Sequence, residues 1–195
     1  AVKLAGEVKN FSTEGIIEKK EARRMERFSQ LALVSAVEAF NQSGLDMEKE
    51  DALRCGVVFS SGIGGLNCTE NNYKTGQRRG FDKISPFYIP NTIPNMAGGN
   101  IAIRLGFKGM CTCVVTACAS GNNAVGDAFH YIRDGYAEVM LCGGTESCIT
   151  DMGIGGFTAM QALNTTDDPN RASIPFDKER AGFVMGEGAG SLILE

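Results

Sequence analysis

Apolar residues along this chain form either short uninterrupted runs or longer stretches with helical spacing or many small residues. The uninterrupted runs predict three buried β-strands, at 54–61, 110–117 and 137–142. The longer stretches predict helices at 21–40, 95–105, 119–134 and 155–163, with a shorter helix through Leu66 and Tyr73. Residues 77–90 hold basic and aromatic side chains and two prolines, which predict a loop.

The alternation of strands and helices predicts an α/β protein with a largely parallel sheet. Because the strands are apolar throughout, we expect helices on both faces of that sheet. Gly143 and Gly144 are expected to end the third strand. Beyond them, 183–185 and 191–194 predict a closing hairpin around the glycines between 186 and 190.

Composition places the chain among folded proteins of ordinary size. Its 195 residues correspond to roughly one domain, and 43% of them are hydrophobic, which is too many for a disordered chain. The formal net charge of −4 argues against a general nucleic-acid binder, which would carry an excess of lysine and arginine. No apolar run approaches the roughly 18 residues of a membrane span, and no signal peptide is recognisable. We therefore expect neither nucleic acid nor a membrane as a partner.

The cysteines indicate a reducing compartment. There are seven: Cys55, Cys68, Cys111, Cys113, Cys118, Cys142 and Cys148. An odd number without a secretion signal indicates free thiols, so the expected location is the cytoplasm. Two cysteines separated by one residue do not have zinc spacing, and no second close pair completes four ligands, so no metal site is expected.

Glycines after the first predicted strand do not complete a nucleotide-binding motif. Gly62 and Gly64 could begin a G-x-G-x-x-G pattern, but its third glycine would be position 67, which is Asn67. The phosphate-binding G-x-x-x-x-G-K-[ST] and hydrolase G-x-S-x-G patterns are absent as well. We interpret the segment as a tight turn.

Cys118 is the main candidate for chemistry. It lies where the second predicted strand turns into a helix, and a helix N-terminus has unpaired N–H groups and a partial positive charge. Both features stabilise a thiolate, and the same N–H groups can hold the oxyanion that forms when a thioester is attacked. The small residues after Cys118 leave room for a substrate. On these features alone, a packed cysteine remains the alternative.

No histidine of this chain can serve Cys118 as a base. His130 is the only one, and it lies twelve residues further along the same predicted helix. That spacing puts it about 18 Å away along the helix axis. We therefore interpret His130 as a surface or packed side chain and reject a cysteine–histidine hydrolase within these residues.

Six segments, in this order, resemble the β-ketoacyl-acyl-carrier-protein synthases, and most closely their type II elongating members. They are SSGIGGL at 60–66, KISPFYIPNTIPNMAGGNIA at 83–102, VVTACASG at 114–121, AEVMLCGGTES at 137–147, GIGGF at 153–157 and PFDKERAGFVMGEGAGSLILE at 175–195. The resemblance implies a thiolase-like fold, in which two similar α/β halves form five layers, α-β-α-β-α. Residues 1–195 resemble its nucleophile-bearing N-terminal half without the first strand. The family's two catalytic histidines, a lysine and a gating loop lie in the C-terminal half, which is missing here.

The resemblance also implies a reaction and roles for residues. An acyl chain moves from an acyl-carrier protein to Cys118, and decarboxylative condensation with malonyl-carrier protein then gives a 3-oxoacyl-carrier protein without a metal or redox cofactor. By the same resemblance, Ile63 and Phe157 line the acyl tunnel, and Tyr88 reaches it across a homodimer. Taken without the resemblance, all three would be ordinary core residues. The chain alone is expected to be inactive, because the histidines are missing.

Basic residues suit an acidic carrier protein. Lys20, Arg23 and Arg24 crowd the start of the first predicted helix, and such a patch can steer an acidic partner despite the net negative charge. The resemblance implies carrier docking through these three and near Lys83, where the basic pair of relatives is Asp82-Lys83 here. A solvated helix face is the simpler reading of the patch.

Three other functions stay open. The chain could be a non-catalytic piece that only dimerises or binds a carrier, or a piece of a polyketide ketosynthase. It could also come from a thiolase-fold enzyme that acts on coenzyme A thioesters, which the basic patch disfavours. Cys118 argues against a non-catalytic parent protein.

Overall fold

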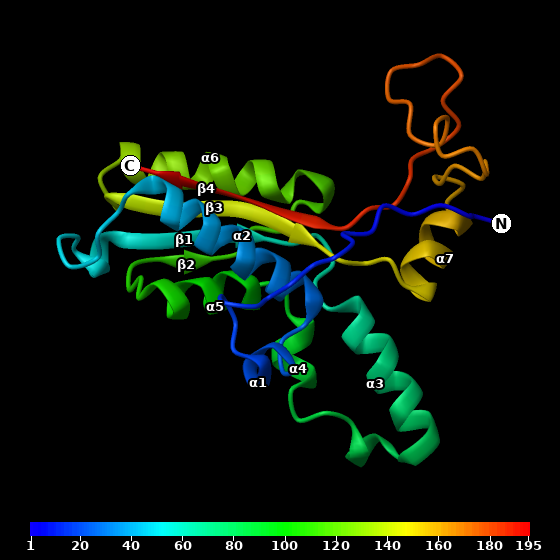
Figure 1. The fold of residues 1–195 in the computed structure, drawn as a ribbon, viewed down its shortest axis with the longest axis horizontal. Helices are drawn as coiled ribbons and strands as arrows, with labels where there is room; N and C mark the ends of the chain where they lie inside the picture. Colours follow the sequence, from blue (N-terminus) through cyan, green and yellow to red (C-terminus); the bar gives the residue numbers. More distant parts are fainter.

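The computed structural model describes all residues, 1–195, and has a four-stranded mixed sheet at its centre (Figure 1). The strands are β1 (Cys55–Ser60), β2 (Cys111–Thr112), β3 (Val139–Glu146) and β4 (Gly188–Leu194), in the spatial order β2-β1-β3-β4. β1 pairs in parallel with β2 and β3, and β4 pairs antiparallel with β3. The predicted largely parallel sheet is therefore confirmed.

The chain also forms seven α-helices. They are α1 (Lys19–Ala22), α2 (Arg27–Ser43), α3 (Leu66–Arg79), α4 (Tyr88–Thr92), α5 (Met96–Leu105), α6 (Ser120–Arg133) and α7 (Asp151–Ala159), and three short 3₁₀ turns are η1 (Ala52–Arg54), η2 (Phe81–Lys83) and η3 (Ala117–Ala119). None of these helices is long and apolar enough to cross a membrane.

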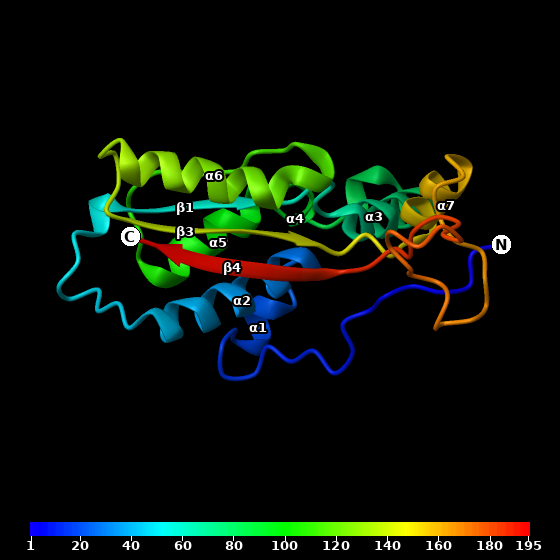
Figure 2. The same cartoon turned by 90° about the horizontal axis from the view of Figure 1, so that it is seen from above.

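The sheet is the middle of three layers, with α6 on one face and α2 and α5 on the other (Figure 2). Alternate residues of the strands supply the two cores. Val57, Phe59 and Leu141 pack toward α2 and α5, whereas Val58 and Met140 pack toward α6. Because both faces are covered, β1 is buried along its whole length, and this explains its uninterrupted apolar sequence.

The connections place a crevice at the carboxyl ends of the parallel strands. The chain leaves β1 toward β2 on one side, and it returns from β2 through α6 to β3 on the other side of β1. In open α/β sheets, ligands bind at such a switch point. The segments after β1, β2 and β3 therefore meet at one end of the sheet.

The predicted strand at 110–117 is mostly wrong. Only Cys111 and Thr112 pair with β1, and residues 115–119 are exposed. β2 lies at the edge of the sheet and has a neighbour on one side only, so nothing holds the chain extended beyond Thr112. An apolar run predicts burial, but it does not show what covers the run.

The predicted hairpin and the predicted end of β3 are also wrong. β3 continues through Gly143 and Gly144 to Glu146, because β4 pairs with it along its whole length. Phe183 forms an isolated bridge with Leu163 and is not part of a hairpin. The glycine-rich segment leads directly into the last strand.

Two helix predictions and one loop prediction need correction. The helix expected at 21–40 is broken into α1 and α2, and the Gln30 side chain accounts for the break by donating 2.8 Å hydrogen bonds to the carbonyls of Ala22 and Met25. The loop expected at 77–90 contains the end of α3 and the start of α4. The helix expected at 155–163 is α7, which begins earlier because the Thr150 side chain caps it through the N–H of Gly153.

Candidate active site

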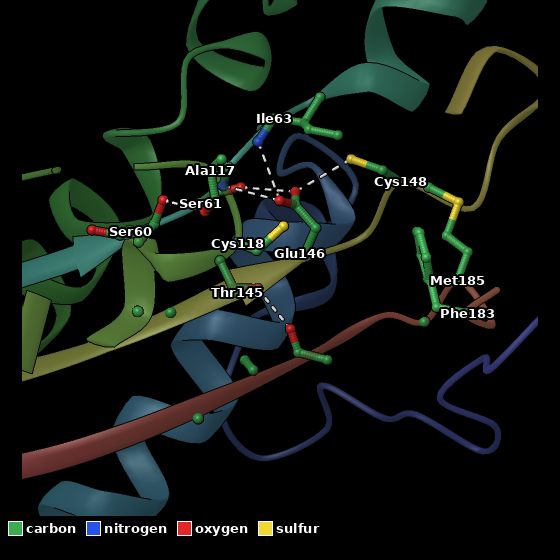
Figure 3. A pocket seen from close by; sticks show the side chains of 18 of the residues that line it. Ser60, Ser61, Ile63, Ala117, Cys118, Thr145, Glu146, Cys148, Phe183 and Met185 are labelled. Carbon is green, nitrogen blue, oxygen red and sulfur yellow. Dashed lines mark hydrogen bonds between the residues drawn. The ribbon is translucent and has the colours of Figure 1, made fainter. Parts of the chain in front are cut away.

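A cavity of about 590 Å³ opens at the carboxyl end of the sheet (Figure 3). Its lining comes from the turn after β1, the start of α6, the end of β3, α7 and the segment before β4. Cys118 is among the lining residues, together with Ile63 and Phe157. The lining is mostly apolar, which suits a hydrocarbon group.

Cys118 lies in η3, two residues before α6 begins at Ser120. Ser120 builds this turn, because its hydroxyl accepts from the N–H of Thr116 at 2.9 Å and donates to the carbonyl of Ala117 at 2.6 Å. Ala117 has a positive φ of 53°, an uncommon conformation for a residue with a side chain. The strained turn presents the exposed Cys118 ahead of the helix N-terminus.

Two glycines let α6 approach the sheet closely enough to place Cys118 there. A Cβ atom on Gly144 of β3 would lie 3.0 Å from the Cα of Gly121 in the first turn of α6. A larger residue at position 144 would push the helix away from β3. Gly144, one of the two glycines that we expected to end β3, therefore serves the close packing of helix and strand.

Burial disfavours the thiolate form of the other six cysteines. Burial raises the pKa of Cys55, Cys68, Cys111, Cys113, Cys142 and Cys148, and for Cys142 it does so to about 11. The Glu146 carboxylate adds to the effect of burial at Cys148. All seven cysteines are free, and no group of three or more His, Cys, Asp or Glu side chains is arranged to hold a metal ion.

Apolar side chains form the far wall of the cavity. Ile63 stands in the turn after β1 and is 42% exposed, so its side chain is not part of the packed core. Phe157 of α7 packs edge-on against Phe183, with 5.3 Å between the ring centroids. Sequence reasoning missed Phe183, whose position between Gly182 and the glycine-rich segment is the one available signal.

Two residues considered in the sequence lie elsewhere. Tyr88 begins α4 and is not among the residues that line this cavity, so its predicted role across a dimer stays a prediction. His130 is exposed in the last turn of α6, at the opposite end of that helix from Cys118. It packs against Phe129, which agrees with a surface side chain.

The predicted carrier-binding residues are exposed and lie outside the cavity. Lys20 is in α1, and Arg23 and Arg24 follow that helix directly. The Arg24 guanidinium stands over the ring of Phe87, 5.2 Å from its centroid, which joins this basic segment to the segment before α4. Lys83 pairs with Asp82 at 2.7 Å, so part of its charge is balanced locally.

Comparison with known proteins agrees with this architecture. The family model described as "Beta-ketoacyl synthase, N-terminal domain" matches residues 6–195. The whole chain is 50% identical to 3-oxoacyl-[acyl-carrier-protein] synthase 2 of Staphylococcus aureus and covers 48% of that protein. Its identity to the protein of the same name from Synechocystis sp. is 47%, and it covers 47% of that one.

Solved structures are similar in fold over the whole chain. A β-ketoacyl synthase from Burkholderia phymatum STM815 superposes with a TM-score of 0.86 at 28% identity, over 100% of this chain and 48% of that one. A type II polyketide ketosynthase, AntDE, bound to its acyl-carrier protein AntF superposes with a TM-score of 0.84 at 28% identity, over 98% of this chain and 46% of that one.

Fold and site together define an α/β half of a thiolase-like protein, with a cysteine in the turn before a helix N-terminus and on the wall of an apolar cavity. The chain belongs to the β-ketoacyl synthase family, and it spans about half the length of the curated relatives it matches.

Proposed function

We propose that this chain is the nucleophile-bearing half of an enzyme that elongates fatty acids by transferring an acyl chain from acyl-carrier protein to Cys118. The observation that carries the proposal is the position of Cys118, at a helix N-terminus and on the wall of an apolar cavity of about 590 Å³. A thiolate placed there can attack, and an acyl chain attached there has apolar surface to enter.

The first half of the reaction uses groups of this chain. The Cys118 thiolate attacks the carbonyl carbon of the acyl thioester, and N–H groups at the helix start stabilise the oxyanion that forms. Collapse of this intermediate breaks the bond to the carrier's thiol, which leaves, and the acyl chain remains on Cys118. The alkyl part then extends between Ile63 and Phe157.

The second half needs groups beyond these residues. Malonyl-carrier protein loses CO2, and the resulting carbanion attacks the acyl carbon on Cys118. The new carbon–carbon bond forms as the Cys118 thiolate leaves, which gives a 3-oxoacyl-carrier protein two carbons longer. We propose that the catalytic histidines for decarboxylation lie in a C-terminal half of the full-length protein, and that no metal or redox cofactor takes part.

Charge and exposed apolar surface support the proposed partners. The basic residues Lys20, Arg23 and Arg24 would attract an acidic carrier protein, and Lys83 would extend that surface. The unpaired edge of β2, flanked by the exposed side chains of Met110 and Val115, supports a homodimer, with Tyr88 reaching the partner's tunnel. Seven free thiols support a cytoplasmic location.

Fatty-acid elongation is favoured over polyketide synthesis by degree of similarity. The chain is 47–50% identical to 3-oxoacyl-[acyl-carrier-protein] synthases 2, but 28% identical to the matched ketosynthase of a type II polyketide system. A non-catalytic role is disfavoured by the presence and exposure of Cys118.

Acyl transfer to the full-length protein tests the proposal. Incubation with radiolabelled acyl-carrier protein should label wild type at Cys118, and addition of malonyl-carrier protein should discharge the label as 3-oxoacyl product. Cys118→Ala should take no label, whereas Cys113→Ala, which removes a neighbouring thiol outside the cavity, should behave as wild type. Labelling that persists in Cys118→Ala would overturn the proposal.

A further inference from the structure

The carboxylate of Glu146, at the end of β3, lies in the cavity against the turn that follows β1 (Figure 3). It accepts hydrogen bonds from the Ser61 hydroxyl at 2.9 Å and from the backbone N–H groups of Gly62 at 2.9 Å and Ile63 at 3.1 Å. The Cys148 thiol is a fourth donor, at 3.2 Å. Glu146 is the only acidic residue that lines the cavity, and it takes part in none of the ion pairs.

These bonds fix the turn from the side of the sheet. Ser61, which donates to Glu146, also accepts from the N–H of Gly64 at 3.0 Å, so Glu146 and Ser61 together satisfy three consecutive backbone N–H groups. Hydrogen bonds to an ionised acceptor are shorter and stronger than neutral ones. The conformation of residues 62–64 therefore depends on one negative charge that comes from a different strand.

The same turn contacts the nucleophile segment. A Cβ atom on Gly62 would lie 2.9 Å from the Glu146 carboxylate and 3.4 Å from the carbonyl oxygen of Ala117. Ala117 is the residue with positive φ that precedes Cys118. The carboxylate and the peptide that precedes the nucleophile therefore both lie close to Gly62 in this turn.

Ile63 connects this network to the substrate. Its N–H is bound by Glu146, while its side chain stands on the cavity wall, half exposed and with little packing to hold it. A side chain with so few neighbours takes its position from its backbone. The group that fixes the backbone of Ile63 thus also fixes the position of the wall relative to Cys118.

We propose that Glu146 is a positioning residue that sets the acyl-chain length accepted by the cavity. It does so by fixing the backbone of Ile63 relative to the peptide that precedes Cys118. The inference rests on the proposed acyl transfer to Cys118. A long acyl chain must pass Ile63, whereas a short one ends before it. A turn released from Glu146 lets Ile63 enter the path of long chains and leaves short chains nearly unaffected.

The test compares kcat/KM for short and long acyl-carrier proteins in the full-length protein. Glu146→Gln keeps the shape of the side chain, removes its charge and turns an amide NH2 toward backbone donors. We expect kcat/KM to fall about tenfold for the long substrate, the factor for one lost charged hydrogen bond, and much less for the short one. The ratio of kcat/KM for the long substrate to kcat/KM for the short one, the long-to-short ratio, should therefore fall. Ser61→Ala, a milder change in the same network, should lower this ratio by less.

Two reference variants complete the design. Ile63→Phe adds bulk to the cavity wall directly and, like Glu146→Gln, should lower the long-to-short ratio. Asp51→Asn removes a carboxylate that accepts from the N–H of Leu53 at 2.9 Å, at the opposite end of β1, and should leave the ratio unchanged. Melting temperatures of all variants separate loss of fold from loss of positioning.

The outcomes distinguish the inference from the proposed function. Suppose that wild type transfers acyl groups, and that Glu146→Gln and Ser61→Ala either keep the wild-type long-to-short ratio or lower kcat/KM equally for both substrates. Glu146 then does not position the wall, and the inference is wrong. If wild type transfers no acyl group to Cys118 at all, the proposed function fails first. A changed ratio with an unchanged melting temperature supports the inference.

Discussion

At the scale of single residues, the chemistry of the chain depends on which of seven thiols reacts. The thiolate is the nucleophilic form, and burial raises the pKa of Cys55, Cys68, Cys111, Cys113, Cys142 and Cys148, with Cys142 at about 11, whereas Cys118 is exposed on the cavity wall. At neutral pH these six are protonated thiols. Limited iodoacetamide treatment of the full-length protein should therefore alkylate Cys118 first. Peptide mapping checks this, and equal labelling of Cys113 or Cys142 would contradict it.

The sequence located some of the residues around the cavity and missed others, for physical reasons. Cys118 was located from its place just before a predicted helix, although the strand predicted before it ends at Thr112, and Ile63 and Phe157 stand beside glycines. Glu146 was missed because its partners, Ser61 to Ile63, are more than eighty residues away along the chain. The pairing of β1 with β3 brings them together, and no local pattern encodes that register.

At the scale of secondary structure, elements buried on both sides were predicted well and edge elements poorly. β1 and β3 are apolar because helices cover both faces, so an apolar run identifies them. The run at 110–117 has the same composition, but β2 lies at the sheet edge and ends after two residues. An apolar sequence indicates that a segment is suited to burial, but it does not show whether other residues of this chain bury it.

An ion pair between elements gives a prediction about pH. Glu187, just before β4, accepts from Arg27 of α2 at 2.8 Å and from the N–H of Val8 at 3.0 Å, and the bond from Arg27 lowers the pKa of this carboxyl. A lowered folded pKa contributes stability that is fully present above the usual value of about 4.3 and is lost as the pH falls through the folded pKa. Glu187→Gln should therefore lower the melting temperature by a few degrees at neutral pH and by less under strongly acidic conditions.

Thermal unfolding of the full-length protein at several pH values measures the effect. The control is Asp134→Asn, since Asp134 pairs with Arg133 on the surface, where an ion pair contributes little. Its melting temperature should stay close to that of wild type throughout. A Glu187→Gln deficit that stays constant down to strongly acidic pH would show that the carboxylate charge is not what stabilises this junction.

At the scale of the whole molecule, the chain leaves both edges of its sheet unpaired and exposes many large apolar side chains, among them Ile103, Tyr136 and Phe176. An unpaired sheet edge is a surface on which another chain can pair. The pattern agrees with the proposed second half and second subunit, which would cover different parts of it.

The last prediction concerns these 195 residues on their own. Acyl transfer to Cys118 needs a nucleophile and at least part of an oxyanion hole, and the turn that carries Cys118 before α6 can supply both, so slow acylation by an acyl-carrier protein is expected. Condensation also needs a group that promotes loss of CO2 from malonyl-carrier protein, and the one histidine here is exposed at the far end of α6. We therefore expect at most one acyl group per chain and no 3-oxoacyl product when radiolabelled malonyl-carrier protein is added. Circular dichroism of the same sample confirms that the chain is folded, and Cys118→Ala sets the background. Repeated turnover by a folded chain would show that decarboxylation does not require histidines beyond these residues.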